Sequence, residues 1–410
     1  MRRILVVGAG HSGLQLALGL QAHGYDVTVM TERTPDEIRA GRVSSTQMMF
    51  PSQLALEAAQ GLDLWDAQVP KLPYTGFTIP GPDGVPFVDW LGDMGGSESV
   101  DQRVKMSTWL ELFARRGGHL VLHPVSVGDI DWYSRNFDLV VVAAGKGELV
   151  TMFDRDHERS IHTEPQRRLA VSYVHGVAHR PEVGEKAVHL NVIPGIGELY
   201  YLPGLTVSGP CEIILVEAIP GGPLDRFAGV RDPREHWART LELIRTYAPW
   251  DYERTRGAEL TDELGVLSGA FTPVVRHPVA ELPSGGIALG IADVVVANDP
   301  ITGQGANSAA RAAAVYLAAI VEHGDRPFDR DWMQQTFERF WDYARHSVKF
   351  TTALLAPPPE HVVQLLAAGN EHQAVADRVA RAIDTPSDFE NFLYEPDKTH
   401  AYLREIGAMP

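Results

Sequence analysis

The beginning of the chain alternates between short apolar runs and a stretch with helical spacing. Residues 3–7, RILVV, form a β-branched run that is typical of a buried parallel strand. Residues 14–23, LQLALGLQAH, are expected to form a helix, and Gly24 stands where a helix C-cap belongs. The run YDVTVMTER then predicts a second strand, with Glu32 near its end. This order of strand, helix and strand predicts an α/β domain with a parallel sheet.

The pattern changes further along the chain. Residues 70–96 are rich in Pro, Gly and aromatic side chains, as expected for an excursion from the first domain. Residues from about 166 to 290 hold several β-rich runs joined by Gly and Pro turns, which is typical of an antiparallel sheet. GGIALGIAD (285–293) predicts a further strand, and an alanine-rich helix follows it. Residues 328–410 are mostly helical, with a break at APPPEH.

These elements predict a mixed α/β fold in three regions. The first is a discontinuous, Rossmann-like α/β domain whose parallel sheet is covered by helices. The second is an inserted domain built on a mostly antiparallel β-sheet, and the third is a C-terminal helical region. The expected boundaries are 1–69, 97–165 and 285–327 for the first domain, 70–96 and 166–284 for the second, and 328–410 for the third.

Composition and charge narrow the choice of partners. The 410 residues carry a formal net charge of −17 and no Lys/Arg run offsets it, so we expect binding neither to nucleic acid nor to anionic membranes. No apolar run approaches the roughly 20 residues that span a bilayer. Cys211 is the single cysteine, so no intrachain disulfide forms and a cytoplasmic location is expected. The histidines show no spacing typical of a metal site, and no metal is predicted.

The first glycine-rich turn, GAGHSG, joins the first strand to its helix. In its G-x-G-x-x-G spacing, Gly8 permits a tight turn, Gly10 lets the backbone approach a pyrophosphate, and Gly13 lets the helix pack on the strand. The helix N-terminus favours the negative charge of the pyrophosphate. Glu32 would accept from ribose hydroxyls and repel a 2′-phosphate. The residues assigned to this dinucleotide site are Gly8, Gly10, His11, Ser12, Gly13, Glu32 and Arg33.

A second glycine-rich turn, DPITGQGAN (299–307), opens the alanine-rich helix. An NAD-dependent dehydrogenase would not need this second loop, whereas FAD is longer and its isoalloxazine ring must also be held. Pro300 fixes the turn, and Gly303 and Gly305 let the backbone approach a flat ring. The helix N-terminus could stabilise negative charge on a reduced flavin. The two loops together favour FAD, and the residues assigned to its ring end are Pro300, Gly303, Gly305, Ala306 and Asn307.

At this point the sequence resembles the flavoprotein monooxygenases built like para-hydroxybenzoate hydroxylase. Their second FAD motif is Gly-Asp followed by a proline and a G-x-G, and the resemblance implies that Asp293 holds the ribityl chain. Ala292 stands where the family usually has glycine. The Asp-Gly pair that serves FAD and NAD(P)H in single-component members is missing, because Ala144 and Gly145 occupy its place. We therefore expect the reduced flavin to be made elsewhere.

Longer strings resemble a narrower family. VTVMTERTPDEIRAGRV, DLVVVAAGKGEL, EPQRRLAV, GELYYLP and NDPITGQGANSAA are similar to the oxygenase component of two-component styrene and indole monooxygenases. The resemblance implies that a separate NADH-dependent flavin reductase delivers reduced FAD, with transient contact at most. It also implies epoxidation of indole or a styrene-like alkene through a flavin C(4a)-hydroperoxide in a dry, apolar pocket. A homodimer is left open.

The segment RVSSTQMMF (42–50) holds the expected substrate contacts. Ser45, Gln47 and Met49 alternate, so on a strand they share one face. Family members assigned to styrene tend to carry asparagine, valine and histidine at these places, and Ser–Gln–Met resembles the indole-preferring group. These three are the predicted catalytic residues, and plain sheet packing is the alternative. The resemblance also places Arg42 near the FAD phosphates, with a surface arginine as the alternative.

Two other functions stay open at this stage. A self-sufficient NAD(P)H-dependent aromatic hydroxylase would share the first loop, and the missing Asp-Gly pair counts against it. A flavin-binding redox sensor would bind FAD tightly and give no oxygenated product.

Overall fold

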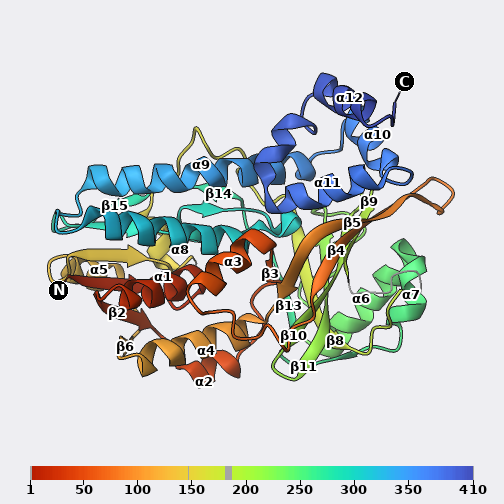
Figure 1. The fold of residues 1–410 in the computed structure, drawn as a ribbon. Coiled ribbons are helices and arrows are strands. Elements are labelled where there is room, and N and C mark those ends of the chain that lie inside the picture. The colour runs from red at the N-terminus through yellow and green to blue at the C-terminus, as the bar shows by residue number, and fades with distance from the viewer. Residues whose placement is uncertain (1, 146, 181–186, 410) are drawn as a thin grey trace.

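A computed structural model describes residues 2–145, 147–180 and 187–409, which build two sheets with helices around them (Figure 1). The first sheet has six strands in the order β15–β16–β7–β1–β2–β6. Neighbours in it are parallel, except that β15 runs antiparallel to β16. The strands are β1 (Arg3–Val7), β2 (Asp26–Thr31), β6 (His119–Leu122), β7 (Leu139–Val142), β15 (Val279–Glu281) and β16 (Ile287–Gly290).

Helices cover the first sheet and share its apolar core. β1 is buried from Ile4 to Val7, as expected for a central parallel strand with both faces covered. The helices that contribute to this core include α1, α4, α8 and α9. Bounds in this part of the chain are α1 (His11–Ala22), α2 (Pro35–Arg39), α3 (Pro51–Ala59), α4 (Gln102–Arg115), α5 (Val127–Tyr133), α8 (Gln304–His323) and α9 (Arg330–Leu355), with 3₁₀ turns η1 (Glu148–Met152), η2 (Ala292–Val294) and η3 (Pro300–Thr302).

The second sheet has nine strands, in the order β12–β8–β11–β10–β9–β4–β5–β3, with β13 also paired to β8. Its pairs are antiparallel, except that β4 and β9 run parallel. Its strands are β3 (Met48–Met49), β4 (Leu72–Pro80), β5 (Pro86–Ser99), β8 (Arg168–His175), β9 (Ala187–Ile193), β10 (Gly197–Thr206), β11 (Gly209–Ala218), β12 (Glu259–Leu260) and β13 (Val266–Gly269). A separate pair joins β14 (Val274–Val275) to β17 (Val296–Ala297).

Both faces of the second sheet are covered, and β10 is therefore buried along its whole length. One face packs on α6 (Pro233–Tyr247) and α7 (Pro249–Thr255). The other shares an apolar core with the C-terminal elements α10 (Glu360–Ala368), α11 (Gln373–Asp384), η4 (Pro386–Asn391) and α12 (Pro396–Glu405), which lie together at one end of the molecule (Figure 1). The contact of α11 with β5 is so close that a Cβ on Gly92 would lie 2.2 Å from the carbonyl oxygen of Ala376.

The predicted fold class is confirmed, and a few predicted elements differ from the observed ones. The strand expected to end at Asp293 ends at Gly290, and Asp293 lies in η2. The strand expected across residues 45–49 is limited to Met48–Met49, which pair with Ser99 and Glu98 of β5. This pairing brings segments about fifty residues apart together, so no local pattern could show it.

Candidate functional site

The first loop, residues 8–13, joins β1 to α1 as its glycine spacing predicts. Gly8 has φ +115°, and a Cβ built on it would lie 2.9 Å from backbone atoms that follow β7. A Cβ on Gly13 would lie 2.2 Å from the carbonyl oxygen of Gly8, whereas a Cβ on Gly10 would meet nothing within 4 Å. Among the described residues, no side chain caps α1. The open space at Gly10 and the uncapped helix N-terminus fit a pyrophosphate.

The side chain of His11, a predicted cofactor residue, contacts other helices. His11 Nε2 lies 3.0 Å from Glu57 Oε1 of α3, and Lys105 Nζ of α4 donates to both Glu57 oxygens at 2.8 Å. Burial lowers the pKa of His11. Burial alone would raise the pKa of Glu57, but Lys105 and His11 outweigh it and lower that pKa to about 2. These contacts tie α1 to α3 and α4, and the predicted contact of His11 with a cofactor stays a prediction.

The other residues predicted for the adenosine end lie in different parts of the structure. Glu32 and Arg33 follow β2 and are exposed, at the same carboxyl edge of the sheet as the first loop. Ser12 is buried in the first turn of α1. Arg42 is exposed and donates from Nη1 to the carbonyl oxygen of Val266 at 2.9 Å, which ties its segment to β13. The predicted contact of Arg42 with phosphate stays a prediction.

Asp293 lies where the carboxyl ends of β7 and β16 meet. A Cβ built on Gly145 would lie 2.9 Å from the Cβ of Asp293, so the site of the missing Asp-Gly pair adjoins this aspartate. Ala292 has φ +53°. This left-handed conformation costs roughly 1–2 kcal/mol for a residue with a Cβ, and glycine adopts it freely. The alanine at the usual glycine position therefore has a backbone conformation that glycine would adopt more easily.

The ring loop, residues 299–307, turns into α8 at a left-handed glycine. Gly303 has φ +66° and is the N-cap of α8, and among the described residues no side chain caps this helix. Gly303, Gly305 and Ala306 are half-buried, and a Cβ on Gly305 would meet nothing within 4 Å. Pro300 begins η3 just before this turn. The loop thus presents open backbone and free helix N–H groups, which fits the flat, electron-rich end of a flavin.

Asn307 joins the ring loop to the substrate segment, residues 42–50. Its Nδ2 donates to the carbonyl oxygens of Met48 and Gly303 at 2.9 and 2.8 Å, and its Oδ1 accepts from the N–H of Phe50 at 2.8 Å. The side chain is fully buried. The side-chain amide therefore holds the two loops together, and the predicted contact of Asn307 with FAD stays a prediction.

Ser45 and Gln47 of the substrate segment bond to Tyr173 of β8. Ser45 Oγ donates to Gln47 Oε1 at 2.9 Å, Gln47 Nε2 donates to the Tyr173 hydroxyl at 2.5 Å, and that hydroxyl donates to the Ser45 carbonyl oxygen at 2.7 Å. Gln47 has φ +37°, so the segment is not extended there. Met48 packs in the apolar core that contains Tyr173, while Met49 is buried outside that core. The expected single face of Ser45, Gln47 and Met49 is therefore wrong, because the turn at Gln47 breaks the alternation.

One face of the second sheet lies under both loops and is mostly apolar. Tyr200 of β10 donates its hydroxyl to the carbonyl oxygen of Ile301 at 2.6 Å, which links this face to the ring loop. Tyr173 links the same face to the substrate segment. We call this face the floor; its residues in the shared apolar core include Val171, Tyr173, Leu190, Tyr200, Leu202, Ile213 and Leu215. Such a surface excludes water from whatever is bound over it.

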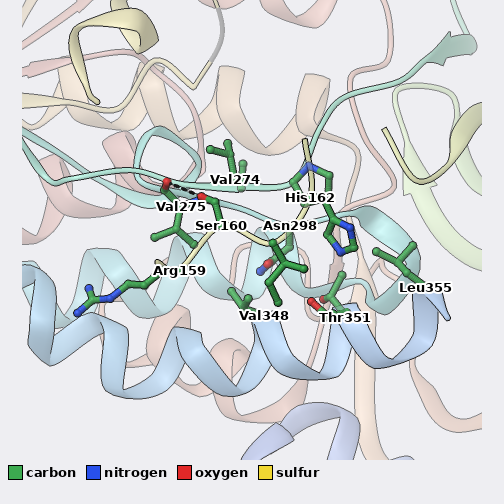
Figure 2. Close-up of a pocket in the computed structure, with 13 residues that line it drawn as sticks. Arg159, Ser160, His162, Val274, Val275, Asn298, Val348, Thr351 and Leu355 are labelled. Carbon is green, nitrogen blue, oxygen red and sulfur yellow. Dashed lines mark hydrogen bonds between the residues drawn. The ribbon is translucent and has the colours of Figure 1, made fainter. Parts of the chain in front are cut away.

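A small cavity lies on another side of the ring loop, between α9 and the β14–β17 pair (Figure 2). Its volume is about 20 Å³, enough for about one water molecule and too small for an aromatic ring. His162 and Asn298 line it, and His162 Nε2 and Asn298 Nδ2 have no hydrogen-bond partner within the described part of the chain. Thr351 of its wall bonds to Thr302 of the ring loop at 2.7 Å. The cavity is therefore a small, mostly apolar gap behind the loop that is too small for the expected substrate.

The sequence matches known proteins along most of its length. Residues 145–254 match a family described as "Styrene monooxygenase A putative substrate binding domain". Over 383 residues, 90% of both chains, the sequence is 32% identical to styrene monooxygenase StyA of Pseudomonas fluorescens. It is 31% identical to styrene monooxygenase StyA of a Pseudomonas species, again over 90% of both chains. The chain belongs to the styrene monooxygenase family.

This styrene monooxygenase family member shares its fold with other flavoenzymes. The flavin-dependent brominase Bmp2 has a TM-score of 0.66 at 13% identity over 99% of each chain. The p-nitrophenol 4-monooxygenase PnpA from Pseudomonas putida DLL-E4 has a TM-score of 0.64 at 12% identity, covering 94% of this chain and 99% of its own. These likenesses show the fold alone. With the family they confirm the prediction of a flavoprotein monooxygenase with a flavin cofactor.

Sequence reasoning missed the residues that support the loops of this styrene monooxygenase family member. Glu57 and Lys105 look like ordinary helix charges, and their burial depends on the packing of α1, α3 and α4. The sequence pattern shows Tyr173 and Tyr200 only as strand residues, although a tyrosine in a buried strand needs a partner for its hydroxyl.

No described helix is long and apolar enough to cross a membrane, and the described residues hold no group of three or more side chains that could bind a metal ion together.

Proposed function

We propose that the protein epoxidises the double bond of indole or of a styrene-like alkene, using reduced FAD that a separate NADH-dependent reductase supplies. The observation that carries the proposal is the junction made by Asn307. It holds the ring loop and the substrate segment together over an apolar floor. A flavin ring bound at the ring loop and a substrate bound at the substrate segment would then be neighbours.

The chain would hold FAD at both loops. The first loop offers the space at Gly10 and the N-terminus of α1 to the pyrophosphate, and Glu32 lies at the edge where a ribose is expected. Asp293 is proposed for the ribityl chain, and Gly303, Gly305 and Ala306 for the ring. When bound in its reduced form, FAD supplies two electrons to dioxygen and so makes one oxygen atom available for transfer.

Protein side chains then position the substrate and keep water away. The floor is apolar between Tyr173 and Tyr200, whose hydroxyls are satisfied by carbonyl oxygens of the two loops. Ser45 donates its hydroxyl hydrogen to Gln47, so its oxygen keeps lone pairs that can accept from the N–H of an indole. Styrene has no such donor. This asymmetry favours indole over styrene, and it agrees with the resemblance of Ser–Gln–Met to the indole-preferring group.

The proposal that reduced flavin comes from a separate protein is supported by the residues that follow β7. Ala144 and Gly145 stand where single-component hydroxylases carry the Asp-Gly pair that serves NAD(P)H, and Gly145 is packed against Asp293. No carboxylate is therefore available at that position from β7. The proposed partner is a reductase that releases reduced FAD, with at most a transient contact.

The test combines purified protein, FAD and NADH with indole or styrene, with and without an unrelated flavin reductase. Blue pigment from indole, or styrene oxide, formed only when reductase is present supports the proposal. Turnover with NADH alone would favour the self-sufficient hydroxylase. Reductase alone is the control for chemistry in free solution. Tight binding of reduced FAD with no oxygenated product from either substrate would sink the proposal in favour of a flavin sensor.

A further inference from the structure

A group of buried charged side chains lies where β10 and β11 approach the ring loop. Glu198 and Glu217 are direct partners across these antiparallel strands. Arg167 precedes β8, and Asp299 is the first residue of the ring loop. Their exposed fractions are 0% for Glu217, 2% for Asp299, 6% for Glu198 and 7% for Arg167. Four charged side chains are therefore withdrawn from water beside the candidate flavin site.

The cluster holds three carboxyl groups and a single cation that acts on them. Arg167 is committed to Glu198, with Nε donating to Oε2 at 2.8 Å and Nη2 donating to Oε1 at 2.9 Å. Neither carboxyl oxygen of Glu217 has a hydrogen-bond partner among the residues that the structure describes. A buried carboxylate without a cation or hydrogen bonds is strongly disfavoured, so the group takes up a proton. Burial, with Asp299 and Glu198 nearby, raises the pKa of Glu217 well above its usual value.

Asp299 connects this cluster to the ring loop. Its carboxyl group accepts from the N–H of Ile301 at 3.2 Å, and the carbonyl oxygen of the same Ile301 accepts from the Tyr200 hydroxyl. Burial raises the pKa of Asp299 to about 6, against the opposing effects of its hydrogen bond and of Arg167. The charged groups that act on Asp299 are Arg167 and Glu198, and Asp299 in turn acts on Glu217. The ring-loop end of the floor therefore holds carboxyl groups that keep or exchange protons near neutral pH.

We propose that Glu217 and Asp299 form an internal proton store for the monooxygenase reaction, with Asp299 on the side of the ring loop. The inference rests on the proposed function. Anionic, singly protonated reduced flavin, dioxygen and an alkene give oxidised flavin, an epoxide and water only if one more proton is added. Two electrons leave the flavin, one oxygen atom goes to the alkene, and the other leaves as water. Glu217 and Asp299 supply that proton where the apolar floor excludes bulk water, and solvent later restores it.

The first experiment needs no turnover. Glutamine has the shape of a protonated glutamic acid, so Glu217→Gln is expected to fold. Infrared spectra of the protein at neutral pH should show the carbonyl stretch of a protonated carboxylic acid, and Glu217→Gln should lose it. Glu259→Gln, an exposed position on β12, is the matched control and should keep the band. A spectrum that Glu217→Gln leaves unchanged would overturn the inference.

The second experiment follows the return of oxidised flavin after the protein loaded with reduced FAD is mixed with oxygen and styrene. Glu217→Gln should slow this return by at least about tenfold at about pH 8, the lower end of what a positioned acid contributes. Asp299→Asn should slow it mainly near pH 6, because Asp299, with a pKa of about 6, has already lost its proton at pH 8. The slowing in Glu217→Gln should shrink at about pH 5.5, where solvent protons replace the store; a merely structural defect would not depend on pH in this way. A Glu217→Gln rate equal to that of the wild type at about pH 8 would overturn the inference. Absence of any product from the wild-type protein would instead overturn the proposed function.

Discussion

The junction at Asn307 can be tested by replacing it with alanine. The side chain makes three hydrogen bonds, and two of its partners, Met48 and Phe50, are buried residues of the substrate segment. Asn307→Ala removes the hydrogen bonds that its side chain makes to the carbonyl oxygen of Met48 and to the N–H of Phe50. A buried backbone group left without a partner costs about 1–3 kcal/mol. The expected loss in the free energy of unfolding is therefore about 2–6 kcal/mol.

Urea unfolding gives this loss, and hydrogen exchange shows where it acts. The amide of Phe50 should exchange at least about tenfold faster in Asn307→Ala, because its acceptor is gone. Asn298→Ala is the matched control: it replaces the same residue type in the adjoining stretch, and Asn298 Nδ2 has no hydrogen-bond partner among the described residues. It should change the stability by less than about 1 kcal/mol. The freed segment should also lower the fraction of consumed oxygen that ends in product, with hydrogen peroxide making up the difference.

A different result would refute this reasoning. If Asn307→Ala loses less than about 1 kcal/mol and the Phe50 amide exchanges as in the wild type, the three hydrogen bonds do not hold the two loops together. The proposed function would then lose the observation that places a flavin and a substrate side by side.

Three further predictions concern charge, backbone strain and pH. Lys105→Met should destabilise the protein by about 3–5 kcal/mol in urea unfolding, because Glu57 is left as a buried charge; a loss under about 1 kcal/mol would contradict a buried ion pair. Ala292→Val should lower the Tm, since a β-branched residue tolerates a φ of +53° worse than alanine does. Ala292→Gly should change the Tm little, because the relief of strain is offset by the lost burial of the methyl group and by the added entropy of the unfolded chain. Equal Tm values for both variants would refute this reasoning. The folded-state pKa of Asp299 is raised to about 6, so its stabilising protonation is complete below about pH 4 and is lost as the pH rises through about 6. An asparagine side chain cannot titrate, so the free energy of unfolding of Asp299→Asn should rise relative to that of the wild type by up to about 3 kcal/mol as the pH increases from about 4 to above 6. A difference that does not change with pH would exclude the raised pKa.

The parts of the fold that the sequence predicted correctly, including the two loops of the candidate site, depend on local patterns. The strand, glycine-rich turn and helix at Gly8 are contiguous, and so are the turn and helix at Gly303, so their geometry follows from neighbouring residues. The two-sheet architecture was also readable, because buried parallel strands and antiparallel strands carry different apolar patterns.

The parts that were missed depend on contacts between distant segments. Gln47 has a positive φ and bonds to Tyr173, over one hundred residues away, and this conformation differs from the strand on which the predicted face depended. The bonds of Asn307 to Met48 and Phe50 likewise cannot be seen from the chain alone. Glu217 did carry a signal that could have been used: a lone glutamate in the apolar run IILVEA breaks the pattern expected of a buried strand.

The span of the Asn307 junction also constrains how the molecule is made. Its partners Phe50 and Met48 lie 257 and 259 residues earlier in the chain. During synthesis, β1, α1 and the first loop emerge early, but the ring loop leaves the ribosome only after the whole second sheet. Pairings of such sequence separation form slowly, and the unpaired edge of β7 stays exposed until β16 arrives. A nascent chain released before α8 would therefore have the first loop and most of the first sheet, yet lack the ring loop that completes the candidate site.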